Sequence, residues 1–178
     1  LTNLGDFMRI GLNYGDELIL LSNELLHAKS YINIMNFRFS QKIAVNCTIQ
    51  PCLMNCLILK SILQPLVENS IRHGFNLNRP DAIPLPMPEI TINAYQNEDA
   101  FTLEVSDNGY GIDIEKATQA LNQSQTSDGH RHVGLNNVYA RLKAHYQTAS
   151  ITFETIPYFH NTVRIILPPI SKNLQERI

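Results

Sequence analysis

Three short polar clusters carry residue types that can bind a phosphorylated ligand and a cation. The first cluster contains Glu68, Asn69, Arg72 and His73. On a helix, steps of three and four residues place Asn69, Arg72 and His73 on or near one face. An amide oxygen suits a hard cation such as Mg²⁺, and the cation beside it suits phosphate. Taken alone, this run is more typical of a solvated polar helix face.

The second cluster, Asp107, Asn108, Gly109 and Gly111, ends a segment of alternating apolar residues. A carboxylate at this point can accept a hydrogen bond from the amino group of an adenine base. The glycines allow close backbone approach and positive φ angles. A plain Asp-Asn-Gly turn is the alternative interpretation, and only the second glycine makes the pattern more specific.

The third cluster, Gly134, Leu135, Asn136 and Asn137, opens a predicted helix. The first turn of a helix exposes free N–H groups and the positive end of the helix dipole, and both bind phosphate well. An ordinary helix start explains this cluster equally well when it is considered in isolation.

An apolar stripe predicts a helix over residues 16–39. Its members recur at steps of three or four and are Leu18, Leu21, Leu25, Ala28, Ile32, Met35 and Phe39. Such a stripe packs against the core of its own domain or forms half of a dimer interface, and we favour packing. His27 lies on the same helix, and we expect it to pack as well.

The helix that carries Asn69 is predicted over residues 61–73, where Ser61 and Gln64 have the spacing of a capping box. A proline-rich loop is predicted over residues 75–88 and a polar loop over 124–133. The remaining predicted elements are strands at 43–49, 90–94, 101–105, 151–153 and 163–167, a weak helix at 113–123 and a helix from Leu135. This order indicates an α/β fold, an α+β two-layer sandwich in which helices cover one face of a mixed sheet.

The composition is that of an ordinary globular protein. The chain has 178 residues, of which 44% are hydrophobic and 17% charged, with a formal net charge of -2. Because there is no basic excess, we expect no direct nucleic-acid binding. No uninterrupted apolar run reaches the roughly 18 residues of a membrane span.

The three cysteines are Cys47, Cys52 and Cys56. Their number is odd, and no pair has the C-x-x-C spacing of a zinc or redox site. We therefore predict buried, reduced thiols.

In this order and spacing the clusters resemble the ATP-binding domain of sensor histidine kinases. LQPLVENSIRHG at 63–74 is similar to the family's N-box, and DNGYGI at 107–112 to its first glycine box. HVGLNNVYARL at 132–142 is similar to the second glycine box and its helix. ELLHAKSYINIMNFRFSQKI at 24–43 resembles the linker of the LytS-type subfamily.

The resemblance implies a Bergerat ATPase fold, with a mixed, mostly antiparallel sheet, that binds ATP and Mg²⁺. Residues 1–40 would be a helical linker from the dimerisation and phosphoacceptor region, 41–170 the ATP-binding domain and 171–178 a tail. Residues 113–133 would form a lid over the nucleotide.

The resemblance also assigns roles to individual residues. The implied catalytic residues are Glu68, Asn69, Arg72 and His73, and the implied nucleotide-binding residues are Asn69, His73, Asp107, Gly109, Gly111, Gly134, Leu135 and Asn136. Asn69 would be the Mg²⁺ ligand, and Asp107 would read adenine. The role of Glu68 stays open.

The implied reaction transfers the γ-phosphoryl group of ATP to a histidine and thence to a response regulator, of the kind with a LytTR-type DNA-binding domain. The chain begins at Leu1 without an initiator methionine, and none of its histidines has the family's acceptor context. We therefore expect part of a longer protein, and the resemblance implies that this protein is homodimeric and lies in the inner membrane, with this part in the cytoplasm.

Two alternatives remain open at this point. The family carries more glycines where this chain has His130 and His132, and bulkier residues restrict the backbone. That departure favours a nucleotide-binding or dimerising module with weak or no phosphotransfer. The second alternative is an ATPase of the wider superfamily that hydrolyses ATP to drive a clamping motion. The Q-P-L-V-E-N run and the linker argue against this alternative.

Overall fold

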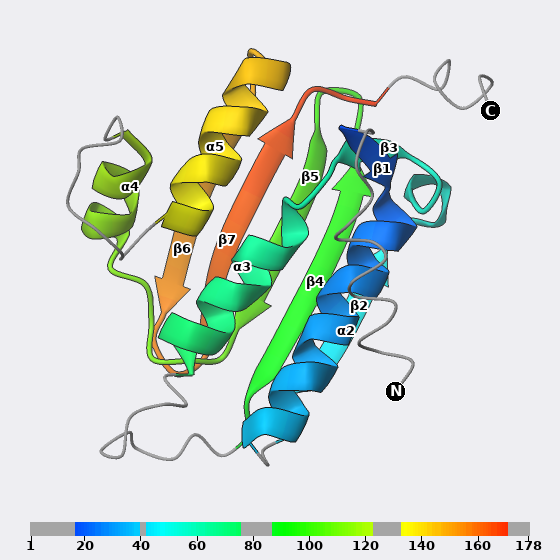
Figure 1. Ribbon diagram of the computed structural model, residues 1–178. Coiled ribbons are helices and arrows are strands. Elements are labelled where there is room, and N and C mark those ends of the chain that lie inside the picture. Colours follow the sequence, from blue (N-terminus) through cyan, green and yellow to red (C-terminus); the bar gives the residue numbers. More distant parts are fainter. Residues whose placement is uncertain (1–16, 40–41, 76–86, 123–132, 171–178) are drawn as a thin grey trace.

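Helices cover one face of a five-stranded sheet in the computed structural model (Figure 1). The structure describes residues 17–39, 42–75, 87–122 and 133–170. The elements are β1 (Leu18–Leu20), α2 (Leu21–Phe39), β2 (Ala44–Ile49), β3 (Leu57–Leu59), α3 (Leu63–Asn69), β4 (Glu89–Gln96), β5 (Phe101–Asp107), α4 (Ile114–Asn122), α5 (Val133–His145), β6 (Ser150–Ile156) and β7 (His160–Leu167), with a 3₁₀ turn at Pro51–Leu53 and a π-helical turn at Ser70–Gly74. The predicted two-layer sandwich is confirmed.

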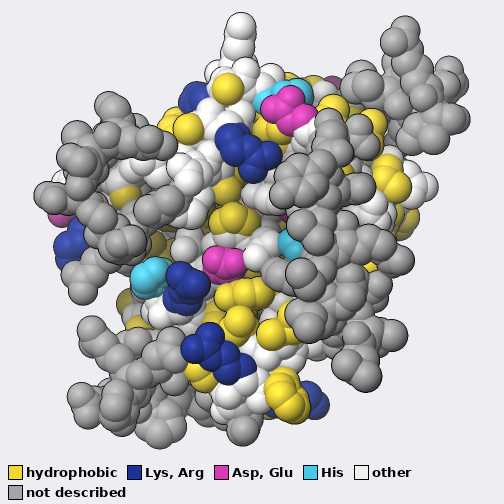
Figure 2. All heavy atoms as spheres, in the orientation of Figure 1, with side chains coloured by type: hydrophobic (Ala, Val, Ile, Leu, Met, Phe, Trp, Pro, Cys, Tyr) yellow, Lys and Arg dark blue, Asp and Glu magenta, His cyan; other side chains and the backbone are white. Residues whose placement is uncertain are grey.

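The sheet is mixed and mostly antiparallel, as predicted. Its strand order is β2-β4-β5-β7-β6, and only the β2–β4 pair is parallel. Alternation along β4 and β5 turns Ile92, Leu103 and Val105 into the core beneath the helices. Figure 2 shows the helix side, where charged and histidine side chains lie dispersed among hydrophobic and uncharged ones in the described part.

The start of the first predicted helix is wrong. Leu18–Leu20 form β1, which pairs antiparallel with β3, and α2 begins at Leu21. The strand β3 was not predicted at all. Both segments are short apolar runs whose strand conformation comes from pairing with each other, and such tertiary pairing overrides local helix propensity.

Helix α2 packs on the core of its own domain, the alternative that the sequence favoured. Leu21, Leu25, Ala28 and Ile32 are all buried in the main apolar cluster. His27 is buried on the same helix, as expected.

The capping box predicted for the next helix is wrong. Helix α3 begins at Leu63, and its N-cap residue, Ile62, makes no side-chain capping bond. Instead Glu24 of α2 accepts backbone N–H groups from Ser61 at 2.6 Å, Ile62 at 3.1 Å and Leu63 at 3.0 Å. Glu24 is 1% exposed. Burial raises the pKa of Glu24, and these backbone donors oppose that shift.

The cysteine prediction is partly wrong. No disulfide joins these three cysteines, but only Cys56 is buried, while Cys47 is half-buried and Cys52 is exposed. Cys52 lies in the turn Pro51–Leu53, away from the sheet's alternation.

Among the helices of the described residues, none combines the length and the apolar character that a membrane span requires. The tail after residue 170, most of the proline-rich loop, and His130 and His132 lie outside the described residues.

Replacing Glu24 by alanine is expected to lower the free energy of unfolding by about 2–4 kcal/mol, because three N–H groups lose their acceptor in a buried place. Urea unfolding followed by circular dichroism measures the change. The matched control is Glu115→Ala on α4, where the side chain is exposed and the effect should stay within about 0.5 kcal/mol. Equal losses in the two variants would contradict the capping role.

Candidate functional site

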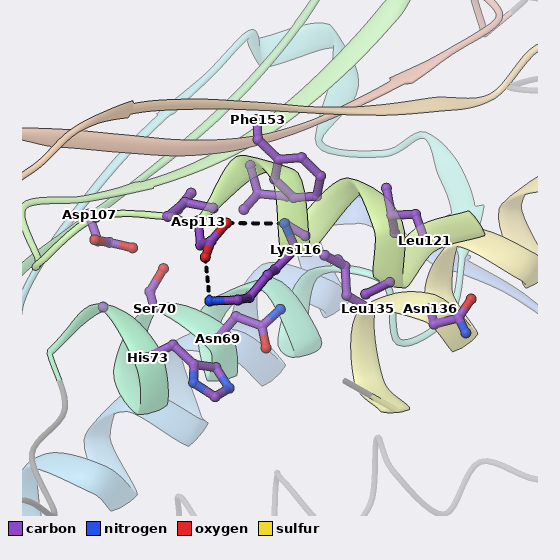
Figure 3. Close-up of a pocket in the computed structure, with 16 residues that line it drawn as sticks. Asn69, Ser70, His73, Asp107, Asp113, Lys116, Leu121, Leu135, Asn136 and Phe153 are labelled. Carbon is purple, nitrogen blue, oxygen red and sulfur yellow. Dashed lines mark hydrogen bonds and ion pairs between the residues drawn. The ribbon is translucent and has the colours of Figure 1, made fainter. Parts of the chain in front are cut away.

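A cavity of about 290 Å³ lies between the end of α3, the loop after β5, α4 and the start of α5. Figure 3 shows its labelled side chains converging from these elements beneath Phe153 of the sheet. The lining residues are Asn69, Ser70, His73, Gly74, Asp107, Gly111, Ile112, Asp113, Lys116, Ala117, Ala120, Leu121, Leu135, Asn136, Phe153 and Val163. Six of the predicted site residues are among them: Asn69, His73, Asp107, Gly111, Leu135 and Asn136.

The end of α3 presents the first cluster to the cavity. Asn69 is the last residue of α3, and the wider π-helical turn that follows carries Ser70 and His73 to the same wall. π-helical turns in α-helices are frequent at functional sites. The other two residues of the predicted catalytic group do not line the cavity. Arg72 instead forms a hydrogen bond with Tyr31 of α2, and Glu68 accepts one from Gln64 at 2.8 Å.

Asp107 is a buried carboxylate at the end of β5. It is 8% exposed, and its Oδ1 accepts the Gly109 N–H at 3.0 Å and the Asn161 amide at 3.1 Å. Burial raises the pKa of Asp107, while the hydrogen bonds from Ser70, Asn161 and Gly109 act in the opposite direction. A buried carboxylate held in place by such donors is suited to accept a further donor from a ligand.

The glycines after Asp107 let the chain pass close to α3. A Cβ atom added to Gly109 would lie 2.2 Å from the carbonyl oxygen of Gly74. Gly111 has a φ of +117°, which other residues rarely adopt. Gly109 therefore shapes the cavity from behind without lining it.

Helices α4 and α5 form the opposite wall. Asp113 and Lys116 are ion-paired at 2.7 Å, and Lys116 holds the pKa of Asp113 below its usual range. Within the described lining, Lys116 is the only lysine or arginine. Gly134 is the second residue of α5 and does not line the cavity, whereas Leu135 and Asn136 after it do.

Sequence reasoning missed several residues of this site. Ser70 and Gly74 lie next to the first cluster in the sequence, and this adjacency could have been used to predict them. Lys116 lies on the weak helix that was predicted as part of the lid, and the residue itself had been given no role. Asn161 contacts Asp107 across strands that are 54 residues apart in sequence, and no local pattern points to such a contact.

Gly109→Ala is expected to destabilise the protein by more than about 2 kcal/mol, because the new methyl group overlaps the backbone of Gly74. Gly134→Ala is the matched control. There the nearest atom to an added Cβ is the Cβ of Pro65 at 3.8 Å, so stability should hold or rise by up to about 1 kcal/mol. Thermal unfolding of both variants measures the change in stability. A Gly109→Ala variant as stable as the wild type would contradict the close approach of Gly109 to Gly74.

The raised pKa of Asp107 gives a pH dependence with a defined sign. A carboxyl whose pKa is higher in the folded than in the unfolded state favours folding below its ordinary pKa. That contribution is lost as the pH rises through the folded value. The melting temperature of the wild type minus that of Asp107→Asn should therefore fall as the pH rises from 4 to 7. If the difference in melting temperature instead grew with pH, the hydrogen-bond donors would have a larger effect on the pKa of Asp107 than its burial.

Comparison with known proteins finds relatives for most of the chain. Residues 55–171 match the family model described as histidine kinase-, DNA gyrase B-, and HSP90-like ATPase, and residues 1–43 match a histidine kinase model. Sensor protein LytS of Oceanobacillus iheyensis is 32% identical over 146 residues, which are 80% of this chain and 24% of that protein. Sensor histidine kinase YpdA of Escherichia coli is 31% identical over 145 residues, 81% of this chain and 24% of that protein. The chain spans about a quarter of the length of these relatives.

Solved structures share the fold at lower identity. The nucleotide-free catalytic domain of histidine kinase ThkA gives a TM-score of 0.62 at 13% identity, covering 85% of this chain and 95% of that one. The mycobacterial sensor histidine kinase MprB gives 0.58 at 13% identity, covering 86% and 98%. These likenesses bear out the Bergerat-type fold that the sequence resemblance implied.

Proposed function

Because the chain belongs to the family of histidine kinase-, DNA gyrase B- and HSP90-like ATPases, we propose that its cavity binds ATP with Mg²⁺ as the catalytic domain of a two-component sensor histidine kinase. The observation that carries the proposal is the presence of the Asn69 amide and the buried Asp107 carboxylate in one cavity.

The residues of the cavity fit an adenine nucleotide. The Asp107 carboxylate can accept the amino group of the base, and Ile112, Leu121 and Leu135 offer apolar contact to its ring. Gly74 lines the cavity and has no side chain to stand between its backbone and the ligand, while Gly109 supports it from behind. Ligand pockets are typically apolar with a few convergent polar groups of this kind.

The polar end of the cavity fits a metal-bound triphosphate. Asn69 would hold Mg²⁺ through its amide oxygen, and the bound ion would neutralise phosphate charge. The first turn of α5, at Leu135 and Asn136, would supply backbone N–H groups. His73 and Lys116 would add donors from the facing walls.

In the proposed reaction an imidazole nitrogen attacks the γ-phosphorus, the bond to the β-phosphate oxygen breaks, and ADP leaves. The acceptor histidine would lie upstream of this chain in a homodimeric, membrane-anchored protein whose cytoplasmic part includes this domain. A response regulator, with a LytTR-type DNA-binding domain in the finer form of the proposal, would receive the phosphoryl group.

Calorimetric titration of ATP with and without Mg²⁺ tests the proposal. Asn69→Ala is expected to remove the Mg²⁺-dependent gain in affinity, and Asp107→Ala to weaken binding at least tenfold under both conditions. Glu115→Gln on the exposed side of α4 is the control and should bind like the wild type.

A folded wild-type chain that binds no ATP would overturn the proposal. Binding without phosphoryl transfer to a supplied acceptor-histidine segment would instead favour the nucleotide-binding module with weak or no phosphotransfer.

A further inference from the structure

Asp107, Asn161 and Thr155 form a row across three neighbouring strands. Asp107 of β5 is paired directly with Asn161 of β7, and Asn161 is paired directly with Thr155 of β6. Directly opposed residues in antiparallel strands bring their side chains within contact distance. The row lies on the face of the sheet that also carries Phe153 and Val163, two lining residues of the cavity.

The Asn161 amide uses each of its groups. Its Nδ2 donates to Asp107 Oδ1 at 3.1 Å and to the Gly109 carbonyl at 3.0 Å, and its Oδ1 accepts the Thr155 hydroxyl at 2.7 Å. Both acceptors of Nδ2 lack a proton to donate, so the orientation of the amide is determined by its partners. Asn161 is 1% exposed, and a lost bond here has no solvent to replace it.

Thr155 extends the row to the loop after β5. Its Oγ1 accepts the backbone N–H of Ile112 at 3.0 Å. Asn161 and Thr155 together therefore fix three points of the segment that forms the base end of the cavity: the Asp107 carboxylate, the Gly109 carbonyl and the Ile112 amide.

Three donors hold the Asp107 carboxylate. Asn161 Nδ2 and the Gly109 N–H bind Oδ1, and Ser70 is the third donor. A carboxylate held by three donors has a set direction in which to accept another donor. A base with an amino group at that place is bound, whereas a base with a carbonyl oxygen there meets a second acceptor and is rejected.

We infer that Asn161 and Thr155 are positioning residues for base recognition, which hold Asp107 and its loop so that a 6-amino purine nucleotide is selected over a 6-oxo one. This inference rests on the proposed function, since it names what selects the nucleotide in the same cavity. Neither residue is among those that line the cavity, and both act through Asp107 and the backbone of residues 109–112.

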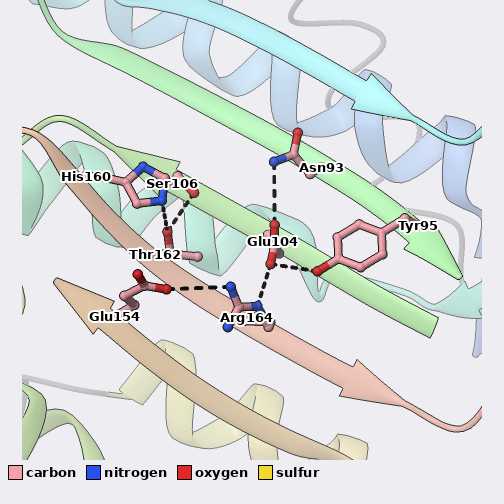
Figure 4. Close-up of polar contacts among 8 residues, drawn as sticks. All are labelled: Asn93, Tyr95, Glu104, Ser106, Glu154, His160, Thr162 and Arg164. Atoms are coloured by element: carbon pink, nitrogen blue, oxygen red, sulfur yellow. Dashed lines mark hydrogen bonds and ion pairs between the residues drawn. The ribbon is translucent and has the colours of Figure 1, made fainter. Parts of the chain in front are cut away.

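Asn93 provides a matched control on the other face of the sheet. It lies on β4, and its Nδ2 donates to Glu104 Oε2 at 3.5 Å. Figure 4 shows this contact within the polar row that includes Arg164 and Tyr95, on the face away from the helices. Asn93→Ala removes the same kind of side-chain amide as Asn161→Ala, at a position that does not line the cavity.

The test measures dissociation constants for ATP and inosine triphosphate, which differ by the amino or carbonyl group at position 6. The wild type should prefer ATP at least tenfold. Asn161→Ala should reduce that preference at least tenfold or to unity, while its affinity for inosine triphosphate changes less than threefold. Asn161→Thr keeps one donor and should recover part of the preference, and Asn93→Ala should keep all of it.

Hydrogen exchange tests the same row without nucleotide. Thr155→Val should speed exchange of the Ile112 amide at least tenfold and lower the ATP preference, with little change at amides of β4. If Asn161→Ala does not fold, the nucleotide preference is measured on Asn161→Thr and Thr155→Val instead.

Equal weakening for both nucleotides, or an unchanged preference in the folded variants, would overturn the inference and leave the proposed function standing. A wild type that binds ATP without preference would do the same. A wild type that binds neither nucleotide would overturn both.

Discussion

The buried carboxylate of Glu24 fixes the helix that carries Asn69, and the geometry of the cavity depends on this contact. It takes the place of a local cap by accepting N–H groups of Ser61, Ile62 and Leu63. Ser61 has a φ of 56°, which residues other than glycine rarely adopt. A helix of seven residues is too short to be stable alone in water. Its start and position are therefore set by α2 and by the pairing of β1 with β3, and the wall formed by Asn69 and His73 follows from them.

Elements with a long, regular pattern could be predicted from the sequence. The strands β4, β5 and β7 alternate over five or more residues, and α2 and α5 carry apolar stripes of several turns. The missed parts depend on contacts between distant segments. Leu18–Leu20 and Leu57–Leu59 are strands because they pair with each other, and Ser61 and Gln64 had the spacing of a capping box that a carboxylate 37 residues away from Ser61 displaced.

The candidate site could be predicted only from the three clusters in combination. Asn69 and Asp107 each belong to a run with an ordinary alternative, a solvated helix face or a plain turn, and the order and spacing of the clusters identified them. Arg72 was grouped with Asn69 on helical spacing, but the π-helical turn at Ser70–Gly74 changes the angle between successive residues, and Arg72 meets Tyr31 instead. Asn161 could not be found because its partners come from β5, β6 and the loop after β5, and its own neighbours in sequence look like any polar start of a strand.

The charged row of Glu104, Arg164 and Glu154 lies on the face of the sheet that no described helix covers (Figure 4). A sheet face without helices would otherwise offer a flat surface on which another sheet could stack. Stacking would strip water from the outer atoms of these ions without supplying new partners, and such desolvation is unfavourable. The row therefore opposes fibril-like association between copies of the protein through this face of the sheet.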